Sequence, residues 1–231
     1  MIYTAAPSGR GRVPPREPSM LDLPPDITFQ HLRFDQDHLE RWESLLSPEE
    51  AIRAGRFPRA KRRDEFVLGR AAARLLLAQR TGTEPGDVAL AVAESGAIDV
   101  IGSPLHVSIA HSGDHAVAAA APRRVGVDIE GIATRHADLA RFMLHPEEHH
   151  LIDSIPLDPD RTHILCWTLK EAALKAMRTG LRTSPKKLRL ELDLDAESAV
   201  VHVDGGATWT VRFEEWDGYY VALAFDAEIA P

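Results

Sequence analysis

The stretch VGVDIE, residues 125–130, is a short apolar strand that ends in two acidic residues. Side chains alternate between the two faces of a strand, so we expect Val127 and Ile129 to face a core while Asp128 and Glu130 share the other face. Two carboxylates held side by side repel each other unless a cation lies between them. The pair therefore indicates an all-oxygen metal site, which suits Mg²⁺. A solvent-facing strand end is the alternative, because an Asp-x-Glu pattern alone is a weak signal.

A second group of polar residues lies on a predicted helix, in the stretch WTLKEAALK at residues 167–175. Trp167, Glu171 and Lys175 follow one another at steps of four, so they share one helix face. The small and apolar residues between them are expected to form the buried face. An ordinary exposed Glu–Lys ion pair, worth roughly 0.3–0.5 kcal/mol, is the alternative interpretation.

A third motif, HVSIAHSG at residues 106–113, is typical of a strand that runs into a polar turn. The imidazole of His111 and the backbone N–H groups beside Ser112 form a group that can bind a phosphate. A purely structural histidine at a strand end is the plainer alternative. His145, His149 and His150 lack the spacing of a zinc site.

The charge of the chain is negative overall but unevenly distributed. A formal net charge of −8 over 231 residues disfavours a nucleic-acid binder, because such proteins carry a basic balance. The segment 51–63 nevertheless holds six bases and no acid: Arg53, Arg56, Arg59, Lys61, Arg62 and Arg63. Such a patch attracts a small polyphosphate or an acidic partner. A solvated helix face is the alternative.

Several classes of protein are disfavoured by what the sequence lacks. No apolar run approaches the length of a membrane-spanning helix, and the single Cys166 excludes an internal disulfide framework. Residues 1–25 carry three Arg and several Pro without a central apolar block, so we expect a flexible leader rather than a secretory signal, with Met20 as a second candidate start. The cytoplasm is the simplest location.

Hydrophobic patterns predict helices and strands in two similar series, which favours an α+β chain of two halves. The expected organisation is a leader at 1–25, an N-terminal half at 26–123 and a C-terminal half at 124–231. Strands are predicted at 27–34, 88–92, 105–110, 115–121, 124–130, 188–194, 200–203, 208–213 and 219–225. Helices are predicted at 37–46, from Ser47-Pro48 onward with a capping box of Ser47 and Glu50, and at 61–79, 136–144, 146–155 and 158–180.

These motifs in this order resemble the Sfp-type phosphopantetheinyl transferases, which activate carrier domains in polyketide and nonribosomal peptide synthesis. The resemblance rests on GVDIE at 126–130, WTLKEAALK at 167–175 and the His111-Ser112 turn, and it extends over roughly residues 27–225. It implies the 4′-phosphopantetheinyl transferase fold: a monomer of two α/β halves related by a pseudo-twofold, with the active-site cleft and coenzyme A between them.

The resemblance also implies the reaction. The 4′-phosphopantetheine arm of coenzyme A passes to a serine hydroxyl of an apo acyl or peptidyl carrier protein domain, and adenosine 3′,5′-bisphosphate is released. Mg²⁺ on Asp128, Glu130 and Glu171 neutralises the pyrophosphate and the leaving phosphate. Lys175 neutralises or protonates the leaving oxygen, and Glu147 is a candidate general base, with Glu171 or a metal-bound water as rivals.

The coenzyme A phosphates are expected to contact the basic segment, the His-Ser turn and the two lysines of the helix motif. This set consists of Arg53, Arg56, Arg59, Arg63, His111, Ser112, Lys170 and Lys175. The bases of the segment 51–63 alternatively meet the acidic carrier domain.

Two departures from the family pattern concern coenzyme A rather than the metal. Members usually carry a Gly-Lys/Arg-Pro turn before the His-Ser strand, but residues 94–98 hold no base, and Ala110 stands where many members have Ser. Two alternative functions follow: a carrier-binding module with weak or lost transferase activity, or a Mg²⁺-dependent coenzyme A pyrophosphate hydrolase. The short holo-acyl-carrier synthases are disfavoured because those chains have half this length.

Overall fold

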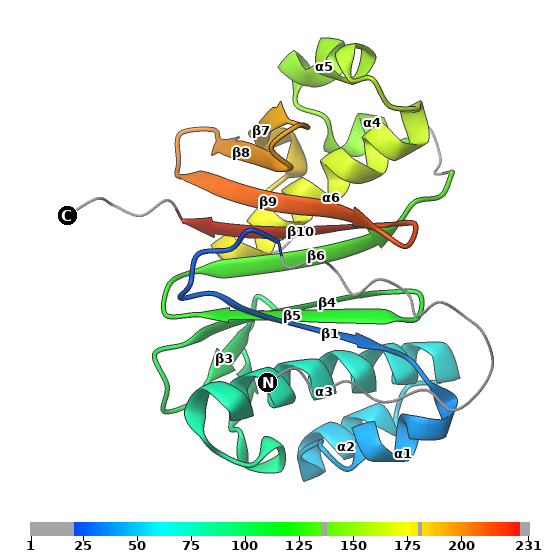
Figure 1. Ribbon diagram of the computed structural model, residues 1–231, viewed down its shortest axis with the longest axis vertical. Coiled ribbons are helices and arrows are strands. Elements are labelled where there is room, and N and C mark those ends of the chain that lie inside the picture. Colours follow the sequence, from blue (N-terminus) through cyan, green and yellow to red (C-terminus); the bar gives the residue numbers. More distant parts are fainter. Residues whose placement is uncertain (1–20, 135–137, 180–181, 227–231) are drawn as a thin grey trace.

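The computed structural model describes residues 21–134, 138–179 and 182–226, so most of the predicted leader lies outside the described residues. Two five-stranded antiparallel sheets lie face to face in the middle of the molecule (Figure 1). The long helix α3 (Ala60–Thr81) covers the outer face of the first sheet, and the long helix α6 (Pro159–Met177) covers the outer face of the second. The protein is therefore a four-layer sandwich of helix, sheet, sheet and helix.

The first sheet has the strand order β1-β5-β4-β3-β2. Its strands are β1 (Thr28–Arg33), β2 (Leu90–Val92), β3 (Ile98–Val100), β4 (His106–Ser112) and β5 (His115–Ala121). The elements η1 (Gln36–His38), α1 (Leu39–Glu43) and α2 (Pro48–Ala54) precede α3, and η2 (Pro85–Asp87) follows it. Helix α2 begins with the predicted capping box, in which Ser47 and Glu50 bond each other's backbone N–H groups.

The second sheet has the order β6-β10-β9-β8-β7. Its strands are β6 (Val125–Gly131), β7 (Leu188–Asp193), β8 (Ser198–Val203), β9 (Thr208–Trp216) and β10 (Tyr219–Asp226). The elements α4 (Asp138–Met143), η3 (Pro146–Glu148) and α5 (His149–Ser154) precede α6, and η5 (Pro185–Lys187) follows it. The two halves therefore repeat one strand order, with the long helix after the first strand of each.

The Ala-rich strand β5 shows why two opposed sheets suit this sequence. All seven of its residues are buried, because one face packs on α3 and the other packs on the second sheet. Ala118 and Ala120 belong to the α3 core, whereas Val117, Ala119 and Ala121 belong to the core between the sheets. Small residues on both faces let the layers approach closely.

Strand β6 is an edge strand of its sheet, and two serines of β4 bond to that edge. The hydroxyl of Ser108 accepts from the Val127 N–H at 3.0 Å, and the hydroxyl of Ser112 accepts from the Gly131 N–H at 3.3 Å. These bonds satisfy N–H groups that an edge strand leaves open. They join β6 to the N-terminal half and fix the distance between the two halves at the acids.

Helix α6 lies directly on β6 because the strand has a glycine at the contact. A Cβ added to Gly126 would lie 2.1 Å from the Ala172 carbonyl oxygen and 2.3 Å from the Ala176 nitrogen. Only a residue without a side chain allows this approach. The close contact brings Asp128 and Glu130 within reach of the polar face of α6.

The structure confirms the α+β class with two similar halves. It also contains one strand that the sequence analysis missed, β3, whose three residues are too few for a recognisable alternation. Helix α6 ends before the predicted 180, because Arg178 adopts a left-handed backbone with φ 61°. In the part of the chain that the structure describes, no helix has the length and apolar character to cross a bilayer.

Candidate active site

Strand β6 and helix α6 bring four predicted site residues into one neighbourhood: Asp128, Glu130, Glu171 and Lys175. Asp128 is buried at 5% exposure, and the Lys175 Nζ donates to its Oδ1 at 2.6 Å. The indole Nε1 of Trp167 donates to Glu130 Oε1 at 3.2 Å. Val127 and Ile129 point the other way, into the core between the sheets. The predicted alternation of β6 and the predicted polar face of α6 are both confirmed.

The electrostatics of the group reflect its burial and its like charges. The pKa of Asp128 is raised to about 7, chiefly by burial; Lys175 opposes the rise, and Glu130 and Glu171 contribute to it. Burial also raises the pKa of Glu171, and Glu130 adds to that rise. Three carboxylates against one ammonium leave two negative charges uncompensated when all are ionised, so the ionised site requires additional positive charge.

Two buried carboxylate oxygens of this group have no hydrogen-bond partner among the described residues: Asp128 Oδ2 and Glu171 Oε1. Orphaned buried acceptors are rare and call for an explanation such as an ion. Within the described ranges, no three His, Cys, Asp or Glu side chains are already close enough to form a metal cage. The donor chemistry therefore fits a hard divalent cation, although the three acids are not gathered around one point.

His111 lies beside this group, on the side of the first half. Its Nδ1 is 3.7 Å from Glu65 Oε2 on α3, and Glu65 also accepts from Arg62 at 3.0 Å. Burial lowers the pKa of His111; Glu65 opposes this effect and the charges of Lys175 and Arg62 add to it. His111 thus stands between the basic segment and Lys175. Ser112 uses its hydroxyl in the β4–β6 bond described above.

The predicted coenzyme A arginines lie on α2, on the turn after it and at the start of α3. Arg53 and Arg56 are exposed, and the Arg53 guanidinium lies 5.2 Å from the Phe66 ring centroid. Arg59 precedes α3 and is also exposed. Arg63 pairs with Glu43 and is therefore less available to a ligand than the others.

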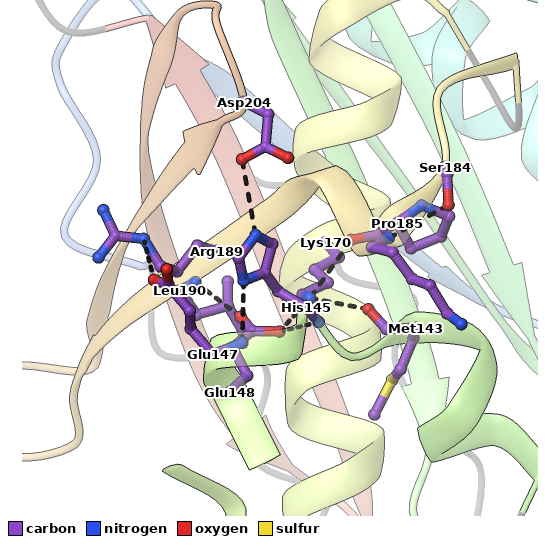
Figure 2. A network of polar contacts seen from close by, with 11 residues as sticks. Met143, His145, Glu147, Glu148, Lys170, Ser184, Pro185, Arg189, Leu190 and Asp204 are labelled. Carbon is purple, nitrogen blue, oxygen red and sulfur yellow. Dashed lines mark hydrogen bonds and ion pairs between the residues drawn. The ribbon is translucent and has the colours of Figure 1, made fainter. Parts of the chain in front are cut away.

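Lys170 lies away from the acids, which contradicts its expected contact with phosphates. Its side chain is fully buried, and Nζ donates to Glu148 and to the carbonyls of Met143 at 2.8 Å and Pro185 at 3.3 Å (Figure 2). Glu148 also accepts from the Leu190 N–H at 2.7 Å. An ammonium enclosed in this way cannot reach a ligand, so its role is to join α6 to the segments around it.

Glu147 is exposed and belongs to the same neighbourhood as Lys170, as Figure 2 shows. Its carboxylate is 3.8 Å from the Arg189 guanidinium on β7, and its N–H donates to His145 Nδ1 at 3.1 Å. None of the contacts recorded for the described residues joins Glu147 to Asp128, Glu130 or Glu171. The structure does not bring this candidate base together with the acids.

Residues that the sequence analysis did not assign line a cavity next to Lys175. The cavity has a volume of about 180 Å³ and lies between the β2–β3 hairpin, β4 and the end of α6. Arg124 and Arg178 contribute to its wall. Their positions, just before β6 and just after α6, are the only signal that the sequence offered, and it is a weak one.

Comparison with known proteins finds similarity to one family. A model described as the 4′-phosphopantetheinyl transferase superfamily matches residues 124–224. A 4′-phosphopantetheinyl transferase of Bacillus subtilis is 24% identical over 183 residues, which cover 78% of this chain and 82% of its own. The 4′-phosphopantetheinyl transferase Sfp of Bacillus subtilis strain 168 is 26% identical over 197 residues, which cover 82% and 86%.

A solved structure, the holo-[acyl-carrier-protein] synthase (AcpS) of Thermotoga maritima, matches 43% of this chain and 60% of that chain, at 25% identity and a TM-score of 0.37. The match thus spans less than two thirds of either chain. The family match covers both β6 and α6, the elements that carry the acids and Lys175. Together with the two Bacillus relatives, this match makes the chain similar to the 4′-phosphopantetheinyl transferases.

Proposed function

We propose that this chain transfers the 4′-phosphopantetheine arm of coenzyme A to a serine hydroxyl of apo acyl or peptidyl carrier protein domains. The reaction releases adenosine 3′,5′-bisphosphate and depends on Mg²⁺. The observation that carries the proposal is the meeting of Asp128, Glu130, Glu171 and Lys175 at the β6–α6 contact, inside the region that matches the superfamily. Carboxylates for a metal beside a cation for a leaving phosphate are what phosphoryl transfer requires.

The three acids are the proposed Mg²⁺ ligands. Asp128 and Glu171 each offer a buried oxygen without a hydrogen-bond partner among the described residues, and Glu130 is held by Trp167. When bound, Mg²⁺ supplies positive charge to the pyrophosphate and to the phosphate that leaves. The raised pKa of Asp128 accords with a site that is fully ionised only with added positive charge.

Lys175 is the proposed partner of the leaving group. Its ammonium is half-buried at the boundary between the acids and the cavity, so it can contact a phosphate oxygen. There it neutralises the oxygen that leaves with adenosine 3′,5′-bisphosphate or donates a proton to it.

Glu171 is the proposed general base for the serine hydroxyl. Burial raises the pKa of this carboxyl, which makes it a stronger base than an exposed glutamate, and the carboxylate oxygen that does not bind the metal would accept the proton. Glu147 is the weaker candidate, because its contacts lie with Arg189 and His145.

The basic segment and His111 are the proposed contacts for the remaining phosphates of coenzyme A. Arg53, Arg56 and Arg59 are exposed, and Arg62 connects through Glu65 to His111. These cations raise the local concentration of an anionic substrate or of an acidic carrier domain.

The Sfp type is favoured within the superfamily, because one chain contains both halves and aligns with the Bacillus Sfp protein over 86% of its length. We therefore propose a monomer that acts in the cytoplasm, where coenzyme A and carrier domains of fatty acid, polyketide or peptide synthesis are present. Two halves in one chain supply both walls of the cleft without a second copy.

The test is to incubate the protein with several apo carrier domains, coenzyme A and Mg²⁺ and to measure the intact mass of each carrier. A gain equal to one phosphopantetheine arm supports the proposal, and its loss on chelation supports the metal. No gain on any carrier would refute it. Free phosphopantetheine released without a carrier would instead indicate a hydrolase, and carrier binding without modification would indicate a binding module.

A further inference from the structure

The cavity beside Lys175 is lined by cationic side chains, two of which pair with acids outside its wall: Lys175 with Asp128 and Arg178 with Asp99. Lys175, Arg124 and Arg178 contribute cationic groups, His106 contributes an imidazole, and no Asp or Glu of the described chain belongs to the wall. Arg124 is exposed, with no recorded hydrogen-bond or ion-pair partner among the described residues. Burial lowers the pKa of His106, and the charges of Arg178 and Arg124 lower it further. A cavity with this lining suits an anionic ligand.

The β2–β3 hairpin forms one wall of the cavity, but it belongs to the other half of the molecule. Ser95, Gly96 and Ala97 of its turn lie on the cavity, and the turn is closed by the bond from Ala93 N–H to the Ala97 carbonyl at 2.8 Å. Strand β2 is a sheet edge of only three residues. Short edge hairpins open easily unless other contacts hold them.

Arg178 supplies such a contact. It follows the last residue of α6 with a left-handed backbone, φ 61° and ψ 20°, which favours glycine over residues with side chains. Its Nη1 donates to the Ile98 carbonyl at 3.1 Å, and its Nη2 pairs with Asp99. The guanidinium thus crosses from the second half to the hairpin of the first.

Arg182, four residues further along the chain, makes a second contact with the same hairpin. Its Nη2 donates to the Glu94 carbonyl at 3.2 Å. The segment that follows α6 therefore holds the hairpin at β3 and at its turn. The Arg178 contact is the more buried of the two, and it alone combines a backbone bond with an ion pair.

We propose that Arg178 is a positioning residue for substrate binding: it holds the β2–β3 hairpin against the end of α6 and thereby forms the cavity that receives an anionic, phosphate-bearing part of the substrate. That this substrate is coenzyme A rests on the proposed function. The hold on the hairpin does not rest on it.

The first test is amide hydrogen exchange of the peptide that covers residues 90–101 in the full chain. Arg178→Gly removes the guanidinium and places glycine where the backbone is left-handed, so global stability is expected to stay equal or rise. The hairpin amides are nevertheless expected to exchange about tenfold faster, the loss typical of a charged hydrogen bond. Unchanged exchange would overturn the proposal.

The second test is ligand binding with the same variant. Coenzyme A and adenosine 3′,5′-bisphosphate are titrated by calorimetry, and carrier loading is measured at varied coenzyme A. We expect the Kd for both probes and the KM to rise about tenfold while kcat changes by less than about twofold. Faster exchange with unchanged Kd and KM would overturn the proposal, and so would a large loss of kcat alone.

Matched variants distinguish the effect of losing the Arg178 contact with the hairpin from the effect of losing a positive charge. Asp99→Ala should reproduce the faster exchange, and Arg178→Gly with Asp99→Ala should add little to it, because the two residues form one pair. Arg178→Lys should restore part of the affinity. Arg80→Gln removes an equal charge at the exposed end of α3 and should change neither readout.

The same experiments distinguish failure of the proposed function. If the wild type loads no carrier, the proposed function is refuted. Amide hydrogen exchange and the Kd for adenosine 3′,5′-bisphosphate still test the role of Arg178 in that case. If the wild type loads carriers and the variant matches it in exchange, Kd and KM, the role of Arg178 fails alone.

Discussion

The sheet of residues 28–121 and the sheet of residues 125–226 have the same strand order, counted from the first strand of each. In both, the last two strands form a hairpin with a two-residue turn, Gly113-Asp114 in one and Asp217-Gly218 in the other. The pairing makes Gln30 of β1 the counterpart of Asp128 of β6, because each lies opposite the fourth residue of its partner strand. The architecture is thus duplicated, whereas the acids occur only in the second half.

The halves also share a buried cation on the long helix. In the first, Arg74 donates to Glu50 at 2.6 Å and to three carbonyls of the loop after α3. In the second, Lys170 donates to Glu148 and to two carbonyls. Each glutamate is the last residue of a Pro-Glu-Glu segment with a capping box. The N-terminal half has this arrangement although it lacks acids equivalent to Asp128, Glu130 and Glu171. The buried cation therefore stabilises the fold in both halves, and this is the role of Lys170.

The largest expected effect concerns the contact that only the second half has. Gly126→Ala places a Cβ within 2.3 Å of two backbone atoms of α6, so helix and strand must separate. We expect a loss of more than about 5 kcal/mol in the free energy of unfolding, measured by urea denaturation. Gly69→Ala is the control in the first half, because its Cβ first meets a side-chain methyl of Ile109 at 3.0 Å. A tolerated Gly126→Ala would show that α6 does not depend on this contact.

Removal of the buried cation comes next. Lys170→Met leaves the Glu148 carboxylate buried without a cation, which should cost about 3–5 kcal/mol in chemical denaturation. Arg74→Met should cost less, because Arg70 still lies 3.6 Å from Glu50. Lys170→Met with Glu148→Gln should recover part of the loss. The folded variant should keep the KM for coenzyme A. A raised KM for coenzyme A together with normal stability would show that Lys170 contributes to substrate binding.

The substitution Asp128→Ala tests whether the two halves differ in their contribution to activity. Carrier loading should fall by on the order of 10²–10³-fold or more, because the buried acid at the centre of the site is lost. Coenzyme A binding, measured by calorimetry, should persist, since the bases remain. The counterpart variant Gln30→Ala should load carriers normally. Near-normal rates for Asp128→Ala would remove this residue from the metal site.

The smallest expected effect is a pH dependence that belongs to the first half. His31 and His115 share a ring hydrogen bond of 2.9 Å beside Trp216, and burial lowers the pKa of His31 to about 3. The unfolded histidine binds a proton below about 6.5, so stability is complete above that pH and is lost as the pH falls toward 3. Unfolding at pH 5.5 should be easier by about 1 kcal/mol.

The control for this pH dependence is His31→Phe, which retains a ring beside Trp216 but cannot titrate. Its stability should fall less between pH 7 and pH 5.5 than that of the wild type. The counterparts of His31 and His115 in the second half are Ile129 and Tyr219, so no similar dependence is expected there. Identical pH profiles for the two proteins would show that the histidine pair does not control acid stability.

The sequence by itself determined the elements whose signal is local. The alternation of β6, the polar face of α6, the capping box at Ser47 and the double series of strands follow from side-chain periodicity and hydrogen-bonding groups within a few residues. The acids at Asp128, Glu130 and Glu171 were found for the same reason. Their meeting was inferred from resemblance, since no local rule brings a strand and a distant helix together.

Only the tertiary structure decided which charges are free to act. Lys170 and Glu171 are neighbours in sequence, but helical geometry turns them to different faces, so one is enclosed by carbonyls and Glu148 while the other faces the acids. In the sequence, Arg178 is only a basic residue near the end of a predicted helix. The structure shows that its left-handed backbone and its bond to the Ile98 carbonyl connect the two halves. Burial and partners depend on long-range packing, and for a charged residue these determine its role.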